Sequence, residues 1–260
     1  HQMVGGNAWI PEVLQDDEWR LNAANDAQHL EVTKSAATWM LQRAARISAT
    51  LSTSGTRQMV TVRVTNETGH KLPTGYPEGR QMWLHVRAYD GAGNMVYESG
   101  RYDYGTQRLI RDDDVKVYEA KQGLTKGFAK ARGMQAGATF HFILNNTVIK
   151  DNRIPPRGYD TTTWDQPGLR PVGATYADGQ YWDETLYALP ANSQAVRVQA
   201  SLYYQTASRE YVEFLKTNGG VDGEALFDLW ERTPSPPILM AADPWYQFWF
   251  PIVTKSWSPR

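Results

Sequence analysis

Residues 59–100 contain three segments in which apolar and polar side chains alternate. In the first segment, Val60, Val62 and Val64 are separated by threonine and arginine. An alternation with a period of two residues is typical of a strand that buries one face. The glycine-rich residues 91–94 suit a tight hairpin turn. The stretch therefore predicts antiparallel strands at 59–65, 81–89 and 95–99.

The same alternation recurs in two later segments, 139–144 and 196–204. Five such strands, connected by loops rich in glycine and proline, favour a mainly β fold. We expect an antiparallel β-sandwich of the immunoglobulin-like kind. Its core is predicted to contain Val62, Val64, Trp83, Ile143, Val198 and Leu202.

Helical patterns flank the predicted sandwich. Apolar residues recur every three or four positions after Asp26, which predicts one long helix over 27–51. Near the C-terminus, Ser208 and Asp222 are suitable N-caps for two short helices. We therefore expect three regions along the chain. They are an N-terminal segment with the long helix (1–55), the β-sandwich (56–207), and C-terminal helices followed by an extended tail rich in proline and tryptophan (208–260).

Two proline-containing loops stand out, GHKLPTGYPEGR (69–80) and KDNRIPPRG (150–158). Proline fixes φ and removes a backbone donor, so these loops are stiff and cannot join a strand ladder. We expect both to have ordered backbones. Arg153 is expected to pair with a carboxylate or with backbone carbonyls, and Asp151 and Asp160 are the candidate acids.

Charge and cysteine content exclude several classes of site. The chain has 27 basic and 28 acidic side chains, which gives no electrostatic reason to expect nucleic acid or an anionic membrane as a partner. No apolar run approaches the roughly 20 residues that span a bilayer. The chain has no cysteine, so it cannot attach haem covalently by its own thiols. Because it begins with histidine, we expect a mature product or a fragment.

Four motifs together resemble the C-terminal region of bacterial multihaem c-type cytochromes. They are HQMVGGN at the N-terminus, NETGHKLPTGYPEGR followed by WLHV, VIKDNRIPPRGYD, and VQASLYYQTASREYVEFL. In that family a run of CxxCH haem sites precedes a haem-free β-sandwich. The motifs lie at both ends and in the middle, so the resemblance covers nearly the whole chain, although this chain has no CxxCH.

The resemblance implies a non-catalytic module that docks or positions haems in an electron-transfer assembly. The haem c would be held covalently by another segment or subunit, with the N-terminal segment packed against it. His1, in HQMVGGN, would then be an axial ligand of that haem, with Trp9 or Trp39 nearby. The family also implies a periplasmic or extracellular location, and it leaves a homo-oligomer or a larger assembly open.

The other candidate residues follow from side-chain chemistry. Imidazole nitrogens ligate iron, so His29 and His70 are candidates, although His70 equally suits a role in holding its loop. The planar guanidinium groups of Arg80 and Arg153 suit carboxylates, haem propionates among them. His85 and His141 fall in predicted strands, where packing is the commoner role.

Two other functions fit single features of the sequence. An N-terminal histidine on a β-sandwich resembles the copper-binding histidine brace of lytic polysaccharide monooxygenases, with His70, His85 or His141 as the second ligand. The long aromatic loop region over 159–190 suits a carbohydrate- or surface-binding module. Motifs of serine hydrolases, zinc proteases and nucleotide-binding loops do not occur in the sequence.

Overall fold

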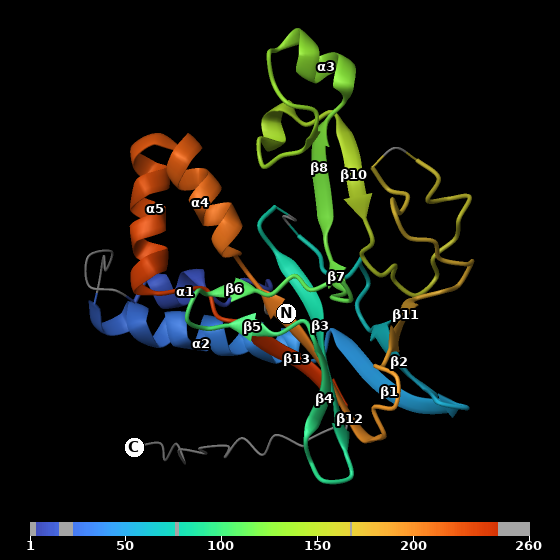
Figure 1. Ribbon diagram of the computed structural model, residues 1–260. Helices are drawn as coiled ribbons and strands as arrows, with labels where there is room; N and C mark the ends of the chain where they lie inside the picture. Colours follow the sequence, from blue (N-terminus) through green and yellow to red (C-terminus); the bar gives the residue numbers. More distant parts are fainter. Residues whose placement is uncertain (1–3, 16–22, 76–77, 167, 244–260) are drawn as a thin grey trace.

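Two antiparallel sheets form the centre of the molecule (Figure 1). The computed structural model describes residues 4–15, 23–75, 78–166 and 168–243. One sheet has the strand order β1 (Ala45–Ser54), β2 (Arg57–Asn66), β11 (Trp182–Ala188). The other has the order β13 (Ile238–Asp243), β12 (Ala195–Gln205), β3 (Gln81–Asp90), β4 (Met95–Ser99), with β7 (Val117–Tyr118) also paired to β3. The predicted mainly β, antiparallel sandwich is confirmed.

The main core lies between these two sheets. Val62 and Val64 of β2 are fully buried there, together with Leu84 of β3 and Leu202 of β12. Each strand places alternate side chains inward, as the two-residue period predicts. The predicted strands at 59–65, 81–89, 95–99 and 196–204 are confirmed, with ends within two residues of the expected ones. Val198 is only partly buried at the margin of this core.

The long N-terminal helix is shorter than predicted. α2 spans Ala23–Leu41, and the expected helix over 45–51 is wrong because this segment belongs to β1. Ile47, Ala49 and Leu51 fit a period of two as well as the helical one. The Gly55 turn, at φ 61°, brings β1 back along β2, where ten residue pairs face each other. No helix within the described residues is long and apolar enough to cross a membrane.

The predicted strand over 139–144 is also wrong. A short strand β9 (Gly137–Ala138) ends just before this segment, which contains instead the 3₁₀ turn η2 (Phe142–Leu144). Phe140 packs edge-on against Tyr211, with ring centroids 5.2 Å apart, instead of entering a sheet. Ile143, predicted in the core, is 83% exposed.

Residues 120–150 form a projection that we call the arm (Figure 1, green, top). It consists of β8 (Ala120–Leu124), α3 (Lys126–Ala131), β9, η2 and most of β10 (Thr147–Asp151). Its strands form a small sheet in the order β10-β8-β9. Gly123 is required here, since a Cβ atom at this position would lie 2.1 Å from the carbonyl oxygen of Gly137.

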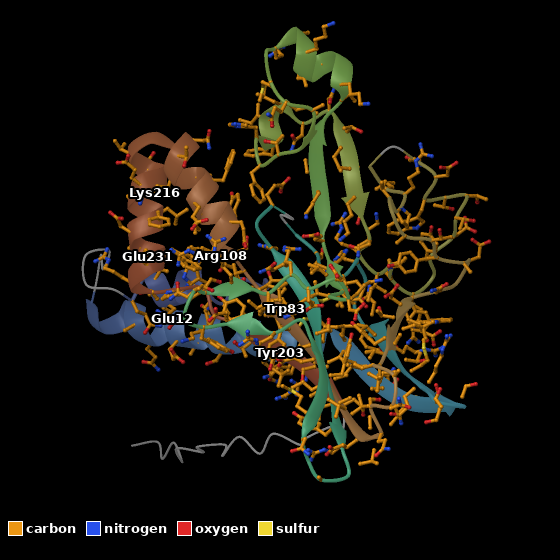
Figure 2. All side chains as sticks on the ribbon, in the orientation of Figure 1. Glu12, Trp83, Arg108, Tyr203, Lys216 and Glu231 are labelled. Atoms are coloured by element: carbon orange, nitrogen blue, oxygen red, sulfur yellow. The ribbon has the colours of Figure 1, made fainter. Side chains whose placement is uncertain are left out.

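Helices α4 (Arg209–Asn218) and α5 (Gly220–Arg232) form the predicted C-terminal pair. Ser208 caps α4 as expected, accepting the N–H of Tyr211. Asp222 is not a cap, because α5 begins two residues earlier, at Gly220. The hairpin of β5 (Tyr102–Asp103) and β6 (Arg108–Leu109) is tied to α4 by ion pairs of Arg108 (Figure 2).

Trp83 lies on the outer face of β3, not in the main core as predicted. It is fully buried beneath the β5–β6 hairpin and β7. Its ring stacks on Tyr203, with centroids 5.6 Å apart (Figure 2), and on Tyr102 at 6.0 Å. The indole nitrogen donates to the carbonyl of Gly100 over 3.1 Å. The sandwich therefore has a second small core on its outside.

One pair of sheet edges is joined at a corner. The last residue of β13, Asp243, accepts the backbone N–H of Ala49 in β1 over 2.5 Å. β1 and β13 are edge strands of different sheets. This side-chain bond closes the sandwich on that side. The predicted extended tail thus begins as β13, and residues 244–260 lie outside the described residues.

Candidate functional site

A groove runs between the N-terminal segment and α2. It has a volume of about 510 Å³, and none of the described residues that line it has a charged side chain. Its walls include Val4, Gly5, Ile10, Pro11, Val32 and Ala36. We call it the α1–α2 groove, where α1 is the short helix Ile10–Val13.

Local hydrogen bonds position the walls of this groove. The side chain of Asn7 accepts the N–H groups of Trp9 and Ile10, which starts α1 directly after the Gly5-Gly6 turn. Trp9 is buried, and its indole nitrogen donates to the carbonyl of Thr233 at the end of α5, over 2.7 Å. An ion pair of 3.2 Å between Glu12 and Lys34 holds α1 against α2. The groove is therefore a fixed part of the fold.

The outer face of α2 continues the groove with exposed apolar side chains. Val32 is 55% exposed and Trp39 is 58% exposed, while Ala37 and Leu41 on the opposite face are buried. His29 is exposed and lies on the same face as Val32, since residues three apart are neighbours on a helix. The guanidinium of Arg43 stacks over the Trp39 ring at 3.9 Å. This face has apolar groups that the described residues leave open to solvent.

The two proline-containing loops are bound to each other at what we call the loop junction. Asp151 is 2% exposed and receives two parallel hydrogen bonds of 2.8 Å from Arg153. It also receives one of 2.7 Å from the buried Lys71 of the other loop. The Lys71 ammonium reaches the carbonyl of Leu169 as well. The prediction that Arg153 pairs with a carboxylate is confirmed.

Electrostatics at the loop junction favour the ionised carboxylate. Burial by itself would raise the pKa of Asp151, but the hydrogen bonds and charges of Arg153 and Lys71 outweigh it, and the pKa lies below its ordinary value. Burial also lowers the pKa of Lys71, against the opposing attraction of Asp151. Two cations thus share one carboxylate, and Arg153 has the bidentate geometry that makes the stronger bond.

Asn66 completes the loop junction from the end of β2. Its buried side-chain amide donates to the carbonyls of His70, Ile154 and Pro155, at 2.7, 3.0 and 2.9 Å. Its oxygen accepts the N–H and the hydroxyl of Thr68. One side chain therefore satisfies backbone groups of both loops.

Replacing Asn66 by alanine is expected to lower the free energy of unfolding by about 2–3 kcal/mol, because the Pro155 carbonyl loses its donor and the side-chain bonds from β2 to both loops are lost. Urea unfolding followed by tryptophan fluorescence measures this change. Asn94→Ala, in the exposed turn between β3 and β4, is the control and should cost less than about 1 kcal/mol. Equal effects at the two positions would contradict the role given to Asn66.

The remaining predicted residues are dispersed. His1 lies outside the described residues. His70 is exposed, and its carbonyl rather than its ring is bound in the loop junction. Arg80 donates to the carbonyl of Thr74 over 2.9 Å within its own loop. The structure thus brings Arg153 and the His70 loop together. His29 lies on α2 and does not belong to this group.

The other two histidines have local partners. His85 Nε2 lies 2.9 Å from a carboxylate oxygen of Glu98. Burial lowers the pKa of His85, and the Glu98 bond opposes this only in part. His141 lies just before η2, edge-on to the Phe214 ring at 4.8 Å. No group of three or more metal-ligating side chains occurs among the residues that the structure describes.

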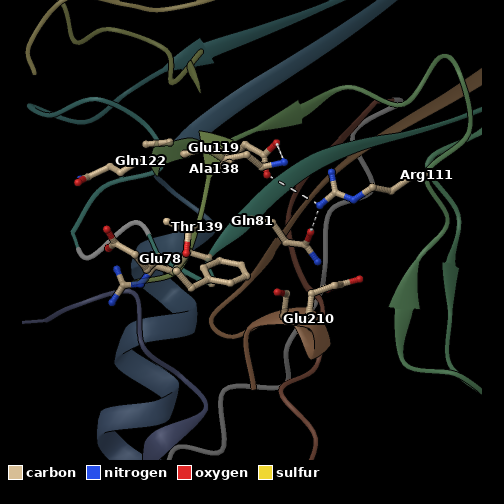
Figure 3. A pocket seen from close by; sticks show the side chains of 14 residues that line it. Glu78, Gln81, Arg111, Glu119, Gln122, Ala138, Thr139 and Glu210 are labelled. Carbon is tan, nitrogen blue, oxygen red and sulfur yellow. Dashed lines mark hydrogen bonds and ion pairs between the residues drawn. The ribbon is translucent and has the colours of Figure 1, made fainter. Parts of the chain in front are cut away.

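A second cavity of about 300 Å³ lies where β3, β8, β9 and the start of α4 meet (Figure 3). Its walls contain Glu119, which is buried and lies 3.0 Å from both Lys121 and Lys150 and 3.8 Å from Arg111. Burial would raise the pKa of Glu119, but these cations lower it overall. The sequence analysis did not single out Glu119. Arg111 and Lys150 are distant from it in the chain, and the residues around it show no clear periodicity.

Most tyrosines of the aromatic loop region are unavailable as a binding surface. Tyr159 and Tyr176 are at most 5% exposed, and the hydroxyl of Tyr176 donates to the carbonyl of Asn152. Tyr187 is buried in β11, a strand that the sequence reading placed in a loop. Sugar stacking requires an open ring face, which these three residues do not offer.

Comparison with known proteins yields one similar fold. No protein-family model matches this sequence, and no curated protein matches it. Among solved structures, the fold is similar to the crystal structure of a penta-heme cytochrome c552 from Thermochromatium tepidum. The TM-score is 0.47 and the sequence identity 18%, over 79% of this chain and 40% of that chain. The present chain therefore spans less than half the length of that cytochrome.

Proposed function

We propose that this chain is a haem-free β-sandwich module of a multihaem c-type cytochrome assembly, where it receives a haem-bearing segment on the α1–α2 groove. The four sequence motifs that resemble this family suggest the assembly. The observation that carries the docking surface is the uncharged groove next to the N-terminal motif HQMVGGN. In this proposal the chain positions the haem for electron transfer and does not itself catalyse a reaction.

The residues of the groove suit one face of a porphyrin. A haem macrocycle is flat and largely apolar, and Val4, Val32 and Ala36 offer apolar contacts without an unpaired charge to bury. Trp39 extends the apolar surface along α2. When bound, the haem supplies one-electron chemistry. Burial of the haem on this face excludes water and thereby changes its reduction potential.

His1 is the proposed axial ligand from this chain. It precedes Val4, which lines the groove, by three residues in the sequence. A neutral imidazole completes a bis-histidine iron site without any cysteine on its own chain. His29, exposed on α2 beside Val32, is the second candidate ligand.

His70, Arg80 and Arg153 do not line the α1–α2 groove, and they are proposed as contacts to propionates of other haems of the assembly. Arg153 already donates from Nε and Nη2 to Asp151, which leaves its Nη1 for a further acceptor. Arg80 uses Nη1 on the carbonyl of Thr74. Both guanidinium groups are thus held in place and retain donors, which suits binding of a second carboxylate.

His1→Ala in the complete assembly is expected to convert one low-spin haem to a high-spin or five-coordinate form. The reason is the loss of one of two axial imidazoles. Electron paramagnetic resonance and the visible spectrum measure the number of low-spin centres. His141→Ala is the control and should leave that number unchanged, because His141 packs against Phe214 just before η2. An unchanged low-spin count in His1→Ala would overturn the assignment, and a loss in His29→Ala alone would transfer it to His29.

A periplasmic or extracellular location in the bacterial envelope is part of the proposal, since covalent haem attachment belongs to that compartment in the resembling family. The haem-bearing partner is a preceding segment or a separate subunit. Fractionation of cells followed by immunodetection of the chain tests the location. Recovery in the cytoplasm would contradict it.

A further inference from the structure

The near-zero net charge of the chain hides a separation of charge. The arm, residues 120–150, contains five lysines and arginines and no aspartate or glutamate. The rest of the chain then has 22 basic and 28 acidic side chains. The arm is also the part that projects from the sandwich (Figure 1). A partner that approaches its end therefore meets positive charge first.

The free cations are at the end of the arm. Lys121 and Lys150, at its base, are both 3.0 Å from Glu119 and are largely neutralised. Lys126, Lys130 and Arg132, on and after α3, are exposed, and none of the three forms an ion pair with a described residue. The guanidinium of Arg132 lies over the Phe128 ring at 4.8 Å.

An exposed apolar side chain lies near these cations. Ile143, in the η2 turn, is 83% exposed. The side chains of Asn146 and Thr125 bond each other, and Asn146 also accepts the N–H of Thr125. These bonds place the η2 turn next to the start of α3. Apolar and cationic groups thus occupy one end of the arm.

We propose that the end of the arm binds an anionic phospholipid surface. Lys126, Lys130 and Arg132 would contact headgroup phosphates while Ile143 enters the interfacial layer. The inference is independent of the proposed haem docking. Cations around a small exposed apolar group are the pattern of proteins that lie on membranes, and each nearby Lys or Arg adds attraction.

The shape of the arm favours a lipid surface over a protein partner. A stable protein interface buries roughly 1,200 Å² or more, which a projecting tip with a few apolar side chains does not supply. A lipid surface deforms around such a tip. The excess acidic charge belongs to residues outside the arm, and its repulsion by the lipid is screened over about 8 Å at physiological ionic strength.

Vesicle flotation with the full chain tests the proposal. We expect binding to phosphatidylcholine–phosphatidylglycerol vesicles but not to pure phosphatidylcholine, and weaker binding at high salt. The double variant Lys126→Glu, Lys130→Glu should bind roughly tenfold or more weakly. Ile143→Ser should weaken binding several-fold. Val221→Ser is the matched control, because Val221 is 80% exposed at the start of α5, away from the arm.

Three outcomes would overturn the proposal. They are equal binding to both kinds of vesicle, unchanged binding of the double variant, and equal losses in Ile143→Ser and Val221→Ser. Binding to soluble polyglutamate without binding to anionic vesicles would also overturn it, in favour of an acidic protein partner. Circular dichroism of each variant verifies that the fold is retained.

Discussion

Replacing Asp151 by alanine is expected to lower the free energy of unfolding by about 3–5 kcal/mol. The substitution leaves the ammonium of Lys71, only 7% exposed, buried without its carboxylate. It also removes both hydrogen bonds of Arg153 within the loop 150–158, and the two proline-containing loops lose the Lys71–Asp151 bond between them. Chemical denaturation monitored by circular dichroism measures the change.

The same carboxylate makes stability depend on pH in the acid range. The pKa of Asp151 is lowered in the folded chain, so its contribution is complete above the unfolded value of about 4. It is lost as the pH falls through the lower, folded value. Asp151→Ala should therefore flatten the acid limb of the stability curve.

An exposed ion pair provides the control for Asp151. Arg63 and Glu184 lie 2.8 Å apart on the sheet surface, and each is about half exposed. Glu184→Ala should cost less than about 1 kcal/mol, because water replaces the lost partner. A loss of that small size in Asp151→Ala would show that the loop junction contributes little to stability.

Trp83→Ala is expected to cost about 3–5 kcal/mol, the range for removing a large aromatic side chain from a packed core. The substitution empties the small outer core between Tyr102 and Tyr203 and leaves the carbonyl of Gly100 without its indole donor. The β5–β6 hairpin should loosen as a result. Hydrogen exchange of the hairpin amides and the urea midpoint measure the two effects.

Trp39→Ala is the control, since Trp39 is 58% exposed on α2. It should change stability by less than about 1 kcal/mol, the value of its stacking with Arg43. If Trp83→Ala and Trp39→Ala had equal effects, the outer core would be unimportant for folding. In the assembly, by contrast, only Trp39→Ala should weaken binding of the haem-bearing segment.

The sheet strands could be predicted because one face of each is buried and the other is not. Val60, Val62 and Val64 show this most clearly. Residues 45–51 could not be assigned from the sequence, since Ala44, Ile47 and Leu51 fit a helical stripe while Ile47, Ala49 and Leu51 fit a strand. Their pairing with β2 depends on the Gly55 turn, and tertiary pairing outweighs local preference there.

The strand predicted over 139–144, which lies in the arm, is wrong for a different reason. TFHFIL has the residues of a buried strand, but in the structure this segment crosses the end of a small sheet and leaves Ile143 in solvent. Hydrophobicity alone does not distinguish a core strand from an exposed apolar tip. The overall net charge does not reveal the basic arm, because it averages over the arm and the acidic remainder of the chain.

At the loop junction, the sequence predicted one of the decisive residues. Arg153 and its partner Asp151 are two positions apart, so their pairing is a local property. Lys71 and Asn66 meet this segment only through the fold, over 80 or more positions along the chain. Such contacts cannot be read from spacing in a single sequence. His1 stays a prediction because it lies outside the described residues.

The bond from Asp243 to Ala49 at the corner of the sandwich has a consequence for aggregation. An edge strand with free N–H groups is a template on which other chains can stack into fibrils. Asp243 occupies one such donor of β1 and places a carboxylate against the edge. Truncation before residue 243 would remove this carboxylate and leave that donor on the edge of β1 open for pairing. Shortened forms of the chain should therefore be prone to amyloid-like self-association, detectable with thioflavin T.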